Sequence, residues 1–490
     1  MARYIKHFAT GLLLSLVGLP CMAQSVTKSS YFVENSTHKH LMNPALAPVR
    51  GYFSFPVAGA FYLGNESNIA FTNFIYPANE TSEGMLRTFM HPSIDANEFL
   101  ATLKEDQYMN VDLRTSLFSF GYWTGSSFVS FDLASRTNYS LNLPYDMFAF
   151  FKKGMSSAAG DTYHLDNLSV GLSTIAEASL GYSVDLSERL RVGLKGKFLA
   201  GGAKVKARLE QMEIVMSPDQ WSITTVGSLE AYGKGLSFVK DADNNVTNVN
   251  FDQSALGLGG MGFAFDLGFE YRIVPGLKLS MAVVDVGRIK WDKANTLKAA
   301  SNGSVSFSGI DNYNPDSLGQ LDMESQVNAM KDDLLEMSKF KEQSVAEDFL
   351  QKLSPTVNAG LEFSLKRISL GALMSTRFMG DKRYTEYTAS LNLKPLRMFN
   401  LSGSYSFIYG KQETFGVALG FVPGFFNLFV ACDYVPTKFN PQYIPLNTTN
   451  TNVQIGLSIP LGKRKVKEVV EEEFDDEENP EIEEEFIIVR

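Results

Sequence analysis

Residues 263–272 read FAFDLGFEYR, so that large apolar side chains alternate with small or polar ones. A strand with this period of two has one apolar face and one polar face. The stretch has about the ten residues that a tilted strand needs to cross a bilayer, whereas strands of soluble proteins are commonly about half as long. It therefore predicts a transmembrane strand with its apolar face toward lipid and its polar face toward a wet lumen.

The same alternation returns along most of the chain after about residue 110. Fourteen segments show it: 112–122, 127–137, 165–185, 189–211, 219–231, 259–272, 276–288, 356–366, 368–378, 385–393, 398–408, 414–421, 425–435 and 452–461. An even number of antiparallel strands brings both termini to the same side of the membrane. We therefore expect an all-β fold, a transmembrane antiparallel β-barrel of about fourteen strands over residues 111–462, with both termini in the periplasm.

The connections between the segments give the barrel a direction. If the first segment runs outward, residues 274–275, 366–367 and 422–424 are short periplasmic turns. The long connections then become extracellular loops: 232–258, 289–355 and 436–451. The connection 138–164 is the exception, because it would be both long and periplasmic, and this misfit indicates an error among the first strands.

Two segments, 165–185 and 189–211, are about twice as long as a membrane crossing requires, and they predict a ribbon that projects above the membrane. The alternation changes phase at Gly201–Gly202, which predicts a β-bulge. Three stretches have a helical pattern instead: 94–109, 144–155 and 323–353. The third makes 289–355 a helical extracellular loop, either a structural cap over the barrel mouth or a lid that gates a ligand.

Residues 1–23 have the three parts of a secretory signal peptide. Arg3 and Lys6 precede an apolar stretch over 10–17, and Cys21-Met22-Ala23 forms the cleavage site. Export favours the barrel over a half-buried soluble sheet, which alternates in the same way, and we expect the outer membrane of a Gram-negative cell. Cleavage before Cys21 would instead give a lipoprotein, and Pro20 argues against it.

Most of the net charge of -10 lies in residues 463–490, which carry runs of Glu and Asp. Such a segment cannot pack and is expected to be a disordered periplasmic tail. It either solvates the protein or docks a periplasmic partner, since it ends in the apolar run Phe486–Val489. The body of the chain has no basic patch typical of nucleic-acid binding, so we expect no nucleic-acid partner.

The chain offers little catalytic or metal chemistry. Its two cysteines are Cys21 in the leader and Cys432, which excludes a disulfide framework. His38 and His40 lie two residues apart without an acidic or cysteine partner at a ligand spacing, so we expect no metal site. No catalytic motif is present, so we expect no enzyme and no cofactor. The dinucleotide-like Gly257-x-Gly259-x-x-Gly262 leads into a strand and is interpreted as a glycine-rich loop.

A series of basic side chains, the basic ladder, follows the polar face of the two long segments. Its members are Arg189, Arg191, Lys195, Lys197, Lys204, Lys206 and Arg208. If the opposite face meets lipid, these cations face the lumen or the ribbon, and a positive lumen would favour anionic solutes. Alternatively they form internal salt bridges with acidic residues of the same region: Glu177, Asp185, Glu210, Asp266 and Glu270.

Asn43-Pro44-Ala45 resembles the Asn-Pro-Ala motif near the mature N-terminus of the outer-membrane long-chain fatty acid transporter superfamily. The resemblance implies fourteen strands and an N-terminal hatch that plugs the lumen. Residues 24–110, which lack sustained alternation, would then be the hatch-like segment. It also implies a passive transporter of small hydrophobic or amphipathic compounds. The alternative is a non-transporting barrel that acts as a scaffold or secretion-associated component through its acidic tail.

The mature chain also resembles a family of Bacteroidetes outer-membrane proteins defined by a domain of unknown function. The matching stretches are 31–36, 40–48, 143–146 and 285–291. This resemblance spans nearly all of 30–462 and implies a fold and a location but no activity. In the final strand, Gln454, Gly456, Ile459 and Leu461 resemble the signal read by the barrel assembly machinery, although aliphatic residues replace the usual aromatic ones. That machinery and outer-membrane lipid are the expected partners.

Overall fold

The computed structural model describes residues 26–463 except for 35, 56–58, 78–85, 256, 308–338, 381, 409–411 and 436–449. The predicted signal peptide, nearly all of the acidic tail and most of the predicted helix 323–353 lie outside the described residues. The described end of that helix prediction is wrong, because Phe340–Gln343 and Phe349–Lys352 form strands β16 and β17.

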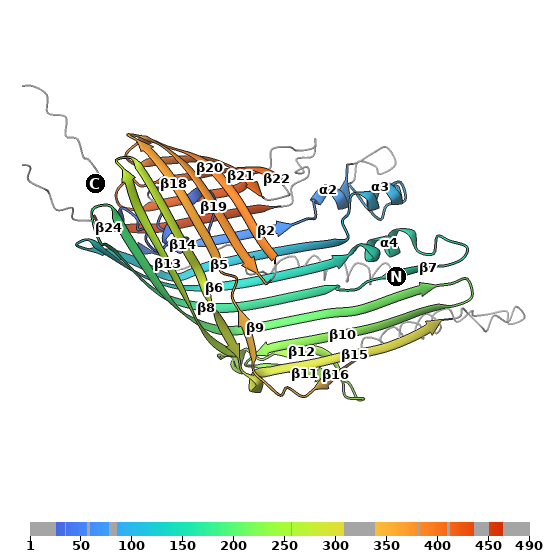
Figure 1. Cartoon of the computed structure of the whole chain (residues 1–490). Helices are drawn as coiled ribbons and strands as arrows, with labels where there is room; N and C mark the ends of the chain where they lie inside the picture. The colour runs from blue at the N-terminus through green and yellow to red at the C-terminus, as the bar shows by residue number, and fades with distance from the viewer. Residues whose placement is uncertain are drawn as a thin grey trace, which may run out of the picture.

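Fourteen antiparallel strands close a barrel within the described residues (Figure 1). Thirteen are single strands: β5 (Asp106–Thr124), β6 (Ser127–Pro144), β8 (Ser169–Asp185), β9 (Leu190–Met216), β13 (Gly260–Val274), β14 (Leu277–Trp291), β18 (Thr356–Leu365), β19 (Ile368–Met379), β20 (Lys382–Leu396), β21 (Phe399–Ile408), β22 (Gln412–Phe421), β23 (Asn427–Val435) and β24 (Thr451–Lys463). The last is composite, since β1 (Arg50–Ser54) and β2 (Phe61–Ser67) follow each other between β24 and β5 and pair with both.

The number of strands was predicted, but one member of the set is wrong. Segment 219–231 is strand β10 (Trp221–Gly233), which pairs with β9 only from Ala203 onward, whereas β13 pairs with β9 over residues 190–201. Strand β10 therefore belongs to the ribbon and not to the wall. Its place in the wall is taken by β1 and β2, which were assigned to the hatch-like segment.

This exchange reverses the direction of the first strands. We call the end of the barrel where Arg50 pairs with Lys463 the turn end, and the opposite end the loop end. Strand β5 runs toward the turn end, so the connection 145–168 joins the long loops and the misfit found in the sequence disappears. The predicted short turns at 274–275, 366–367 and 422–424 all lie at the turn end, where Gly276 and Gly424 have positive φ angles.

The strands differ strongly in length around the wall. Strand β9 has 27 residues and β21 has 10, so the wall from β5 to β9 continues beyond the loop end as a curved sheet (Figure 1). The register between β8 and β9 shifts next to Thr174 and leaves Gly202 as the extra residue, which confirms the predicted bulge. The remaining strands of the sheet are β7 (Asp161–His164), β11 (Leu236–Lys240), β12 (Asn245–Phe251) and β15 (Thr296–Phe307).

Short helices and a small hairpin pack together beyond the loop end. They are α2 (Phe71–Phe74), β3 (Ile75–Tyr76), β4 (Arg87–Thr88), α3 (Ala96–Ala101) and α4 (Tyr145–Lys153), and their core is formed by Phe74, Phe89, Phe99 and Phe148. The helix predicted over 94–109 is shorter than expected, because β5 already begins at Asp106. Helix α3 is capped by Asp95, which accepts hydrogen bonds from the backbone of Asn97 and Glu98. No helix in the described part of the chain is long and apolar enough to cross a membrane.

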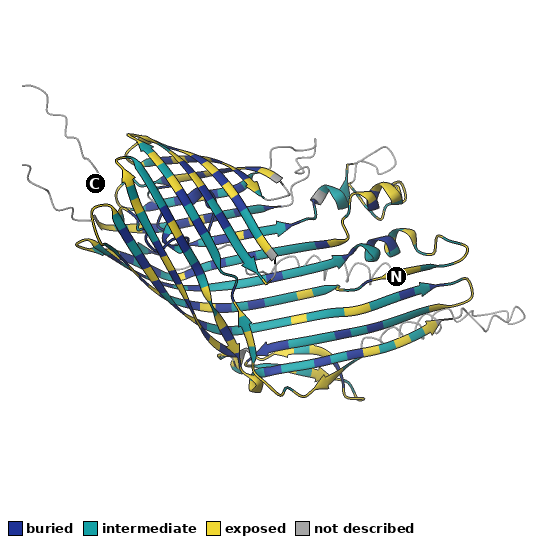
Figure 2. Cartoon of the chain, viewed as in Figure 1, coloured by how far each residue is buried: buried dark blue, intermediate teal, exposed yellow. Residues whose placement is uncertain are grey.

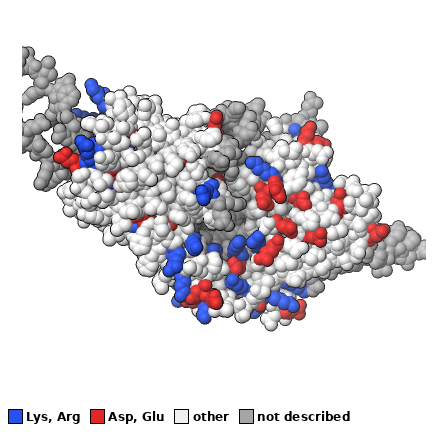
Figure 3. Space-filling view, viewed as in Figure 1, with Lys and Arg blue, Asp and Glu red and all other residues white. Residues whose placement is uncertain are grey.

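The wall has its polar face inside and its apolar face outside (Figure 2). In β13, Phe263 and Phe265 are 61% and 58% exposed, whereas the alternate Ala264 and Asp266 are fully buried. The outer surface in Figure 3 is correspondingly almost free of charge along the wall, and charged side chains gather beyond the loop end. A soluble sheet buries the opposite face, so this arrangement requires an apolar surrounding such as a lipid bilayer.

Candidate functional site: the plugged lumen

The N-terminal residues 26–34 and 36–49 lie inside the barrel and fill it near the turn end, and we call them the hatch. Nearly all of them are buried, including the 3-10 turns η1 (Lys28–Ser30) and η2 (Lys39–Leu41). The hatch is narrower than the predicted segment 24–110. Residues 50–54 and 61–67 build the wall, and residues 68–77 and 86–105 lie beyond the loop end.

Hydrogen bonds and ion pairs join the hatch to strands on several sides of the wall. Asp433 of β23 accepts from the backbone of Lys28 and Ser29 at 2.6 and 3.1 Å. Five more contacts involve side chains of other strands. Gln454 accepts from Thr27 at 2.8 Å, and Glu386 lies 3.6 Å from the Lys28 ammonium. The hydroxyls of Ser280 and Tyr31 are 2.9 Å apart, and Asn358 and Trp123 donate to the carbonyls of Met42 and Pro48. These bonds satisfy buried polar groups that would otherwise each cost about 1–3 kcal/mol.

The hatch motif sits in a notch made by two wall glycines. Gly193 of β9 and Gly268 of β13 are register partners. A Cβ on Gly268 would lie 2.1 Å from Asn43 Oδ1, and one on Gly193 would lie 2.3 Å from the carbonyl carbon of Pro44. Asn43 also donates to the carbonyl of Phe269 at 3.2 Å. Only glycine leaves room for the motif to approach the wall backbone this closely.

Two members of the proposed assembly signal belong to the same hatch–wall interface. Gln454 holds Thr27, and a Cβ on Gly456 would lie 2.5 Å from the His38 ring. Ile459 and Leu461 point the other way and are exposed on the outer face. The inward pair therefore has a structural role in seating the hatch, and recognition by the assembly machinery remains a prediction.

His38 and His40 are both buried between the hatch and the wall. The ring of His40 stacks against Tyr52 with centroids 6.0 Å apart. Burial lowers the pKa of His38 to about 4, so this hatch residue is neutral at pH 7. Among the described residues, no three His, Cys, Asp or Glu side chains are grouped as metal ligands.

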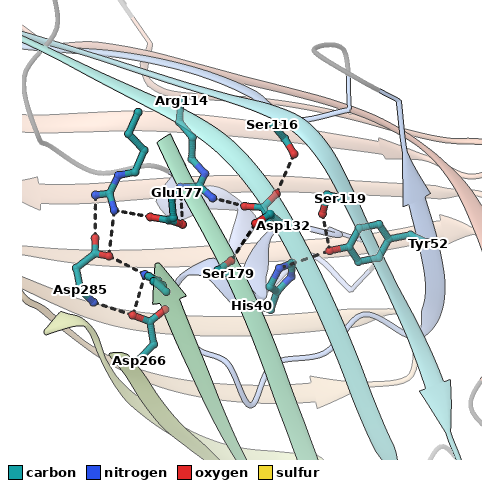
Figure 4. Close-up of polar contacts among 12 residues, drawn as sticks. His40, Tyr52, Arg114, Ser116, Ser119, Asp132, Glu177, Ser179, Asp266 and Asp285 are labelled. Carbon is teal, nitrogen blue, oxygen red and sulfur yellow. Dashed lines mark hydrogen bonds and ion pairs between the residues drawn. The ribbon is translucent and has the colours of Figure 1, made fainter. Parts of the chain in front are cut away.

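A network of paired charges crosses the lumen beyond the hatch (Figure 4). Arg114 of β5 binds Asp132 of β6, and it lies 3.1 Å from Glu177 of β8. Arg136 of β6 lies 2.8 Å from Glu177 and 2.9 Å from Asp285 of β14. Strands β8, β9 and β13 separate β6 from β14 along the wall, so the last pair spans part of the lumen.

A bulge in β14 aims Asp285 into this network. Its φ angle is +61°, and its register partners shift between Phe265 and Leu267. Its backbone amide donates to Asp266 at 2.8 Å, and its carboxylate lies 2.6 Å from the ammonium of Lys197. Lys197 also lies 2.8 Å from Asp266. A strained conformation of this kind persists only where its surroundings hold it, and here three charged partners do so.

The charges of the network balance. Its cations are Arg114, Arg136, Lys195 and Lys197, and its anions are Asp132, Glu177, Asp266 and Asp285, four against four. All eight are buried or nearly so. Because each cation has an acidic neighbour, the network carries no excess positive charge that would attract an anionic solute.

The basic ladder is divided among three places. Arg191, Lys195 and Lys197 face the lumen, where Arg191 lies 2.9 Å from Asp185. Arg189 is exposed in the connection at the turn end. The other three come after the bulge in the sequence. Lys204 lies 4.6 Å from the centroid of the Phe349 ring and donates to Gln351. Lys206 is exposed, and Arg208 donates to Asn167. The structure therefore does not gather the ladder into one site.

An apolar cluster faces inward between the network and the loop end, and we call it the mouth cluster. It consists of Ile175, Leu199, Tyr232, Ala264, Ile289, Trp291 and Leu353, with Phe349 packed against it. The Trp291 ring lies over Gly201, where a Cβ would come within 2.8 Å, and its indole donates to Gln351 at 3.0 Å. The neighbouring inner face on the side of the charge network is polar, so the cluster marks a change from polar to apolar lining toward the loop end.

Sequence reasoning missed Arg114, Asp132, Arg136 and Asp285 of the network. Asp285 and Trp291 do lie in the family-like stretch 285–291, which was the available signal. A second signal is the period-two series from Gly193 through Lys195, Lys197 and Leu199 to Gly201, which lists the inner face of β9 in order. Reading it requires knowing which strand lies opposite.

Comparison with known proteins identifies a family. The profile of the family of unknown function DUF5723 matches residues 44–433, so the chain belongs to that family. No curated protein sequence matches.

Solved structures with a similar fold include a toluene transporter of Ralstonia pickettii, TbuX, with 9% identity, a TM-score of 0.42, and coverage of 90% of this chain and 98% of that one. The Pseudomonas putida toluene transporter TodX has 8% identity, a TM-score of 0.41, and coverage of 92% and 100%. A Pseudomonas aeruginosa FadL homologue has 8% identity, a TM-score of 0.42, and coverage of 90% and 99%. Likeness at this level carries no argument about function.

Proposed function

We propose that this member of the family is an outer-membrane β-barrel that passively admits small hydrophobic or amphipathic compounds from its loop end. The outer-membrane location is supported by the apolar outer face of the wall and by the leader predicted at residues 1–23. With the loop end outside the cell, both the hatch and the start of the acidic tail lie on the periplasmic side. The long loops then face outward, as is usual for such barrels.

The observation that carries the transport proposal is the mouth cluster. It places apolar side chains on the inner face of the barrel, directly between the loop end and the charge network. The buried members of the cluster are at most 6% exposed, so a compound must part these side chains to enter, and it then gains about 25 cal/mol for each Å² of its apolar surface that leaves water. Lys204 and Gln351 border the cluster and offer donors to a polar end group.

Uptake of labelled hydrophobic compounds by a deletion strain tests the proposal. We expect lower uptake than in cells that carry the protein, and partial or full loss when Trp291→Ala replaces the central ring of the cluster. The matched control is Trp221→Ala, because Trp221 is an exposed tryptophan on the ribbon. Uptake that is unchanged by the deletion, across a panel from aromatic hydrocarbons to long-chain carboxylic acids, would overturn the proposal.

A second candidate is a non-transporting barrel that serves as a scaffold. It is favoured by the closure of the lumen, since the hatch is bonded around the wall and two ion pairs reach across it, Arg136 with Asp285 and Arg377 with Glu66. Its docking element would be the acidic tail 463–490. Affinity capture of periplasmic proteins with the full chain and with a chain ending at residue 463 discriminates. A partner held only by the full chain supports the scaffold, and identical captures argue against it.

A further inference from the structure

Three neighbouring wall strands, β20, β21 and β22, carry buried polar atoms that have no hydrogen-bond partner. These atoms are Asn392 Oδ1 on β20, Asn400 Nδ2, Ser402 Oγ and Ser404 Oγ on β21, and Thr414 Oγ1 on β22. All five side chains point inward and are at least nine-tenths buried. A buried polar atom without a partner costs about 1–3 kcal/mol, so five on one patch of wall require an explanation.

The five residues form one continuous strip, which we call the hydroxyl strip. Ser402 pairs with Asn392 on one side and with Ala418 on the other, and Ser406, beside Thr414, continues the row. Asn400 lies near the turn end and Thr414 near the loop end, so the strip follows the full length of β21. None of its members is charged.

The hatch passes this strip without bonding to it. Among the described residues, no hydrogen bond joins the hatch to β21 or β22, although η1 lies against both strands. Val33 of the hatch packs on Ala418 of β22 and on Phe429 and Ala431 of β23, and it lies 3.9 Å from a Cβ position on Gly420. Among the described residues, the ion pairs of the hatch are at the two ends of β20, Lys28 with Glu386 and Glu34 with Lys394.

We propose that the hydroxyl strip is one wall of a narrow conduit for water and small uncharged polyols, which runs between the hatch and strands β20–β22. Hydroxyl and amide groups spaced along a pore replace the hydrogen bonds that such a solute loses on leaving water. The strip offers an ion no charge of its own, and the carboxylates beside it, Glu386 and Asp433, already hold Lys28 of the hatch, so the cost of desolvation excludes ions. Along β21 and β22 only van der Waals contacts such as those of Val33 must loosen, because the ion pairs that hold the hatch to β20 lie at the two ends of that strand.

Swelling of proteoliposomes in a glycerol gradient tests the conduit with the purified full-length protein. We expect wild-type vesicles to swell faster than empty ones. Ser402→Val adds a methyl group and removes a donor, so it should return the rate toward that of empty vesicles. Val33→Ala, which thins the opposite wall, should raise it. Ser402→Ala removes the hydroxyl without added volume and serves if the valine variant fails to fold, as judged by heat-modifiable mobility on a gel.

The matched control is Ser173→Val. Ser173 of β8 is also buried and its hydroxyl also has no partner, but it lies on the other side of the barrel. Swelling that is unaffected by this control and lowered by Ser402→Val supports the conduit. Wild-type swelling equal to that of empty vesicles, an equal loss in both variants, or a large chloride current would overturn it. Uptake of hydrophobic compounds depends on the mouth cluster and not on the strip, so the two proposals fail separately.

Discussion

The inner face of the barrel has two sides that close the lumen with different chemistry. From β5 to β14, which we call the charged side, the strands have 15 to 27 residues, and ion pairs among seven of the eight network charges cross-link them. From β20 to β22, the strands have 10 to 15 residues, and their inner face is mostly Ser, Thr and Asn, with charge at the two ends of β20, Glu386 and Lys394. The long strands support the projecting sheet, and the ion pairs tie them together at its base.

The difference determines where the wall tolerates change. A buried ion pair adds little net stability when complete, yet loss of one partner leaves an uncompensated charge. A buried hydroxyl without a partner contributes no bond that can be lost. The charged side should therefore be sensitive to single substitutions, and the hydroxyl strip should be nearly indifferent to them in stability.

The largest effect is expected at Asp285. Asp285→Ala removes the carboxylate that faces both Arg136 and Lys197, and we expect the free energy of unfolding to fall by about 3–5 kcal/mol. Urea unfolding in lipid vesicles, followed by gel mobility, measures the loss. The control is Asp348→Ala, which breaks the solvent-exposed pair with Lys290 and should leave the midpoint unchanged. Equal midpoints for both variants would show that the network does not stabilise the barrel.

An intermediate effect is expected where the hatch meets β9. Gly193→Ala forces the Pro44 backbone away from the wall, and overpacking of this kind costs about 1–3 kcal/mol. Gly196→Ala on the same strand is the control, because nothing lies within 4 Å of its Cβ position. The comparison requires thermal unfolding of both variants in the same detergent. A Gly196→Ala protein as unstable as Gly193→Ala would mean that strand propensity, and not the hatch, causes the loss.

The smallest effect on stability is expected when a hydroxyl that has a hydrogen-bond partner is compared with one that has none. Ser375 donates to Asn358, which in turn donates to the carbonyl of Met42 in the hatch. Ser375→Ala should therefore cost about 1 kcal/mol, whereas Ser402→Ala should cost nothing or slightly stabilise the barrel. Paired urea titrations of the two alanine variants check the order. A larger loss at Ser402 would indicate that its hydroxyl has a bonded partner after all.

The wall strands could be predicted because lipid imposes a local pattern. In β13 the type of each side chain indicates whether it faces lipid or the lumen, and this pattern can be read without knowing which strands lie beside β13. The composite strand escaped detection because Arg50–Ser54 and Phe61–Ser67 are short and interrupted. Strand β10 alternates like a wall strand although it belongs to the ribbon. Pattern alone does not tell a strand inside the membrane from one that continues beyond it.

The charge network could be predicted only in part. Glu177 and Asp266 were named as possible partners of the basic ladder, because they lie in phase with it on adjacent segments. The pair of Arg136 with Asp285 required the order of strands around the wall and the bulge that turns Asp285 inward. The notch at Gly193 and Gly268 was likewise hidden, since its partner Asn43 is about 150 residues away from the first of them in the sequence.

The composite strand constrains the order in which the molecule can be assembled. Strands β1 and β2 complete the wall by pairing with β24, so the first strand to be synthesised forms the closing seam with the last. The hatch directly precedes that seam and contacts strands on all sides of the interior. The hatch must therefore take its place before β1 and β2 pair with β24, while the sheet is still open. The sheet then closes around the hatch, and the hatch is not inserted into a completed barrel.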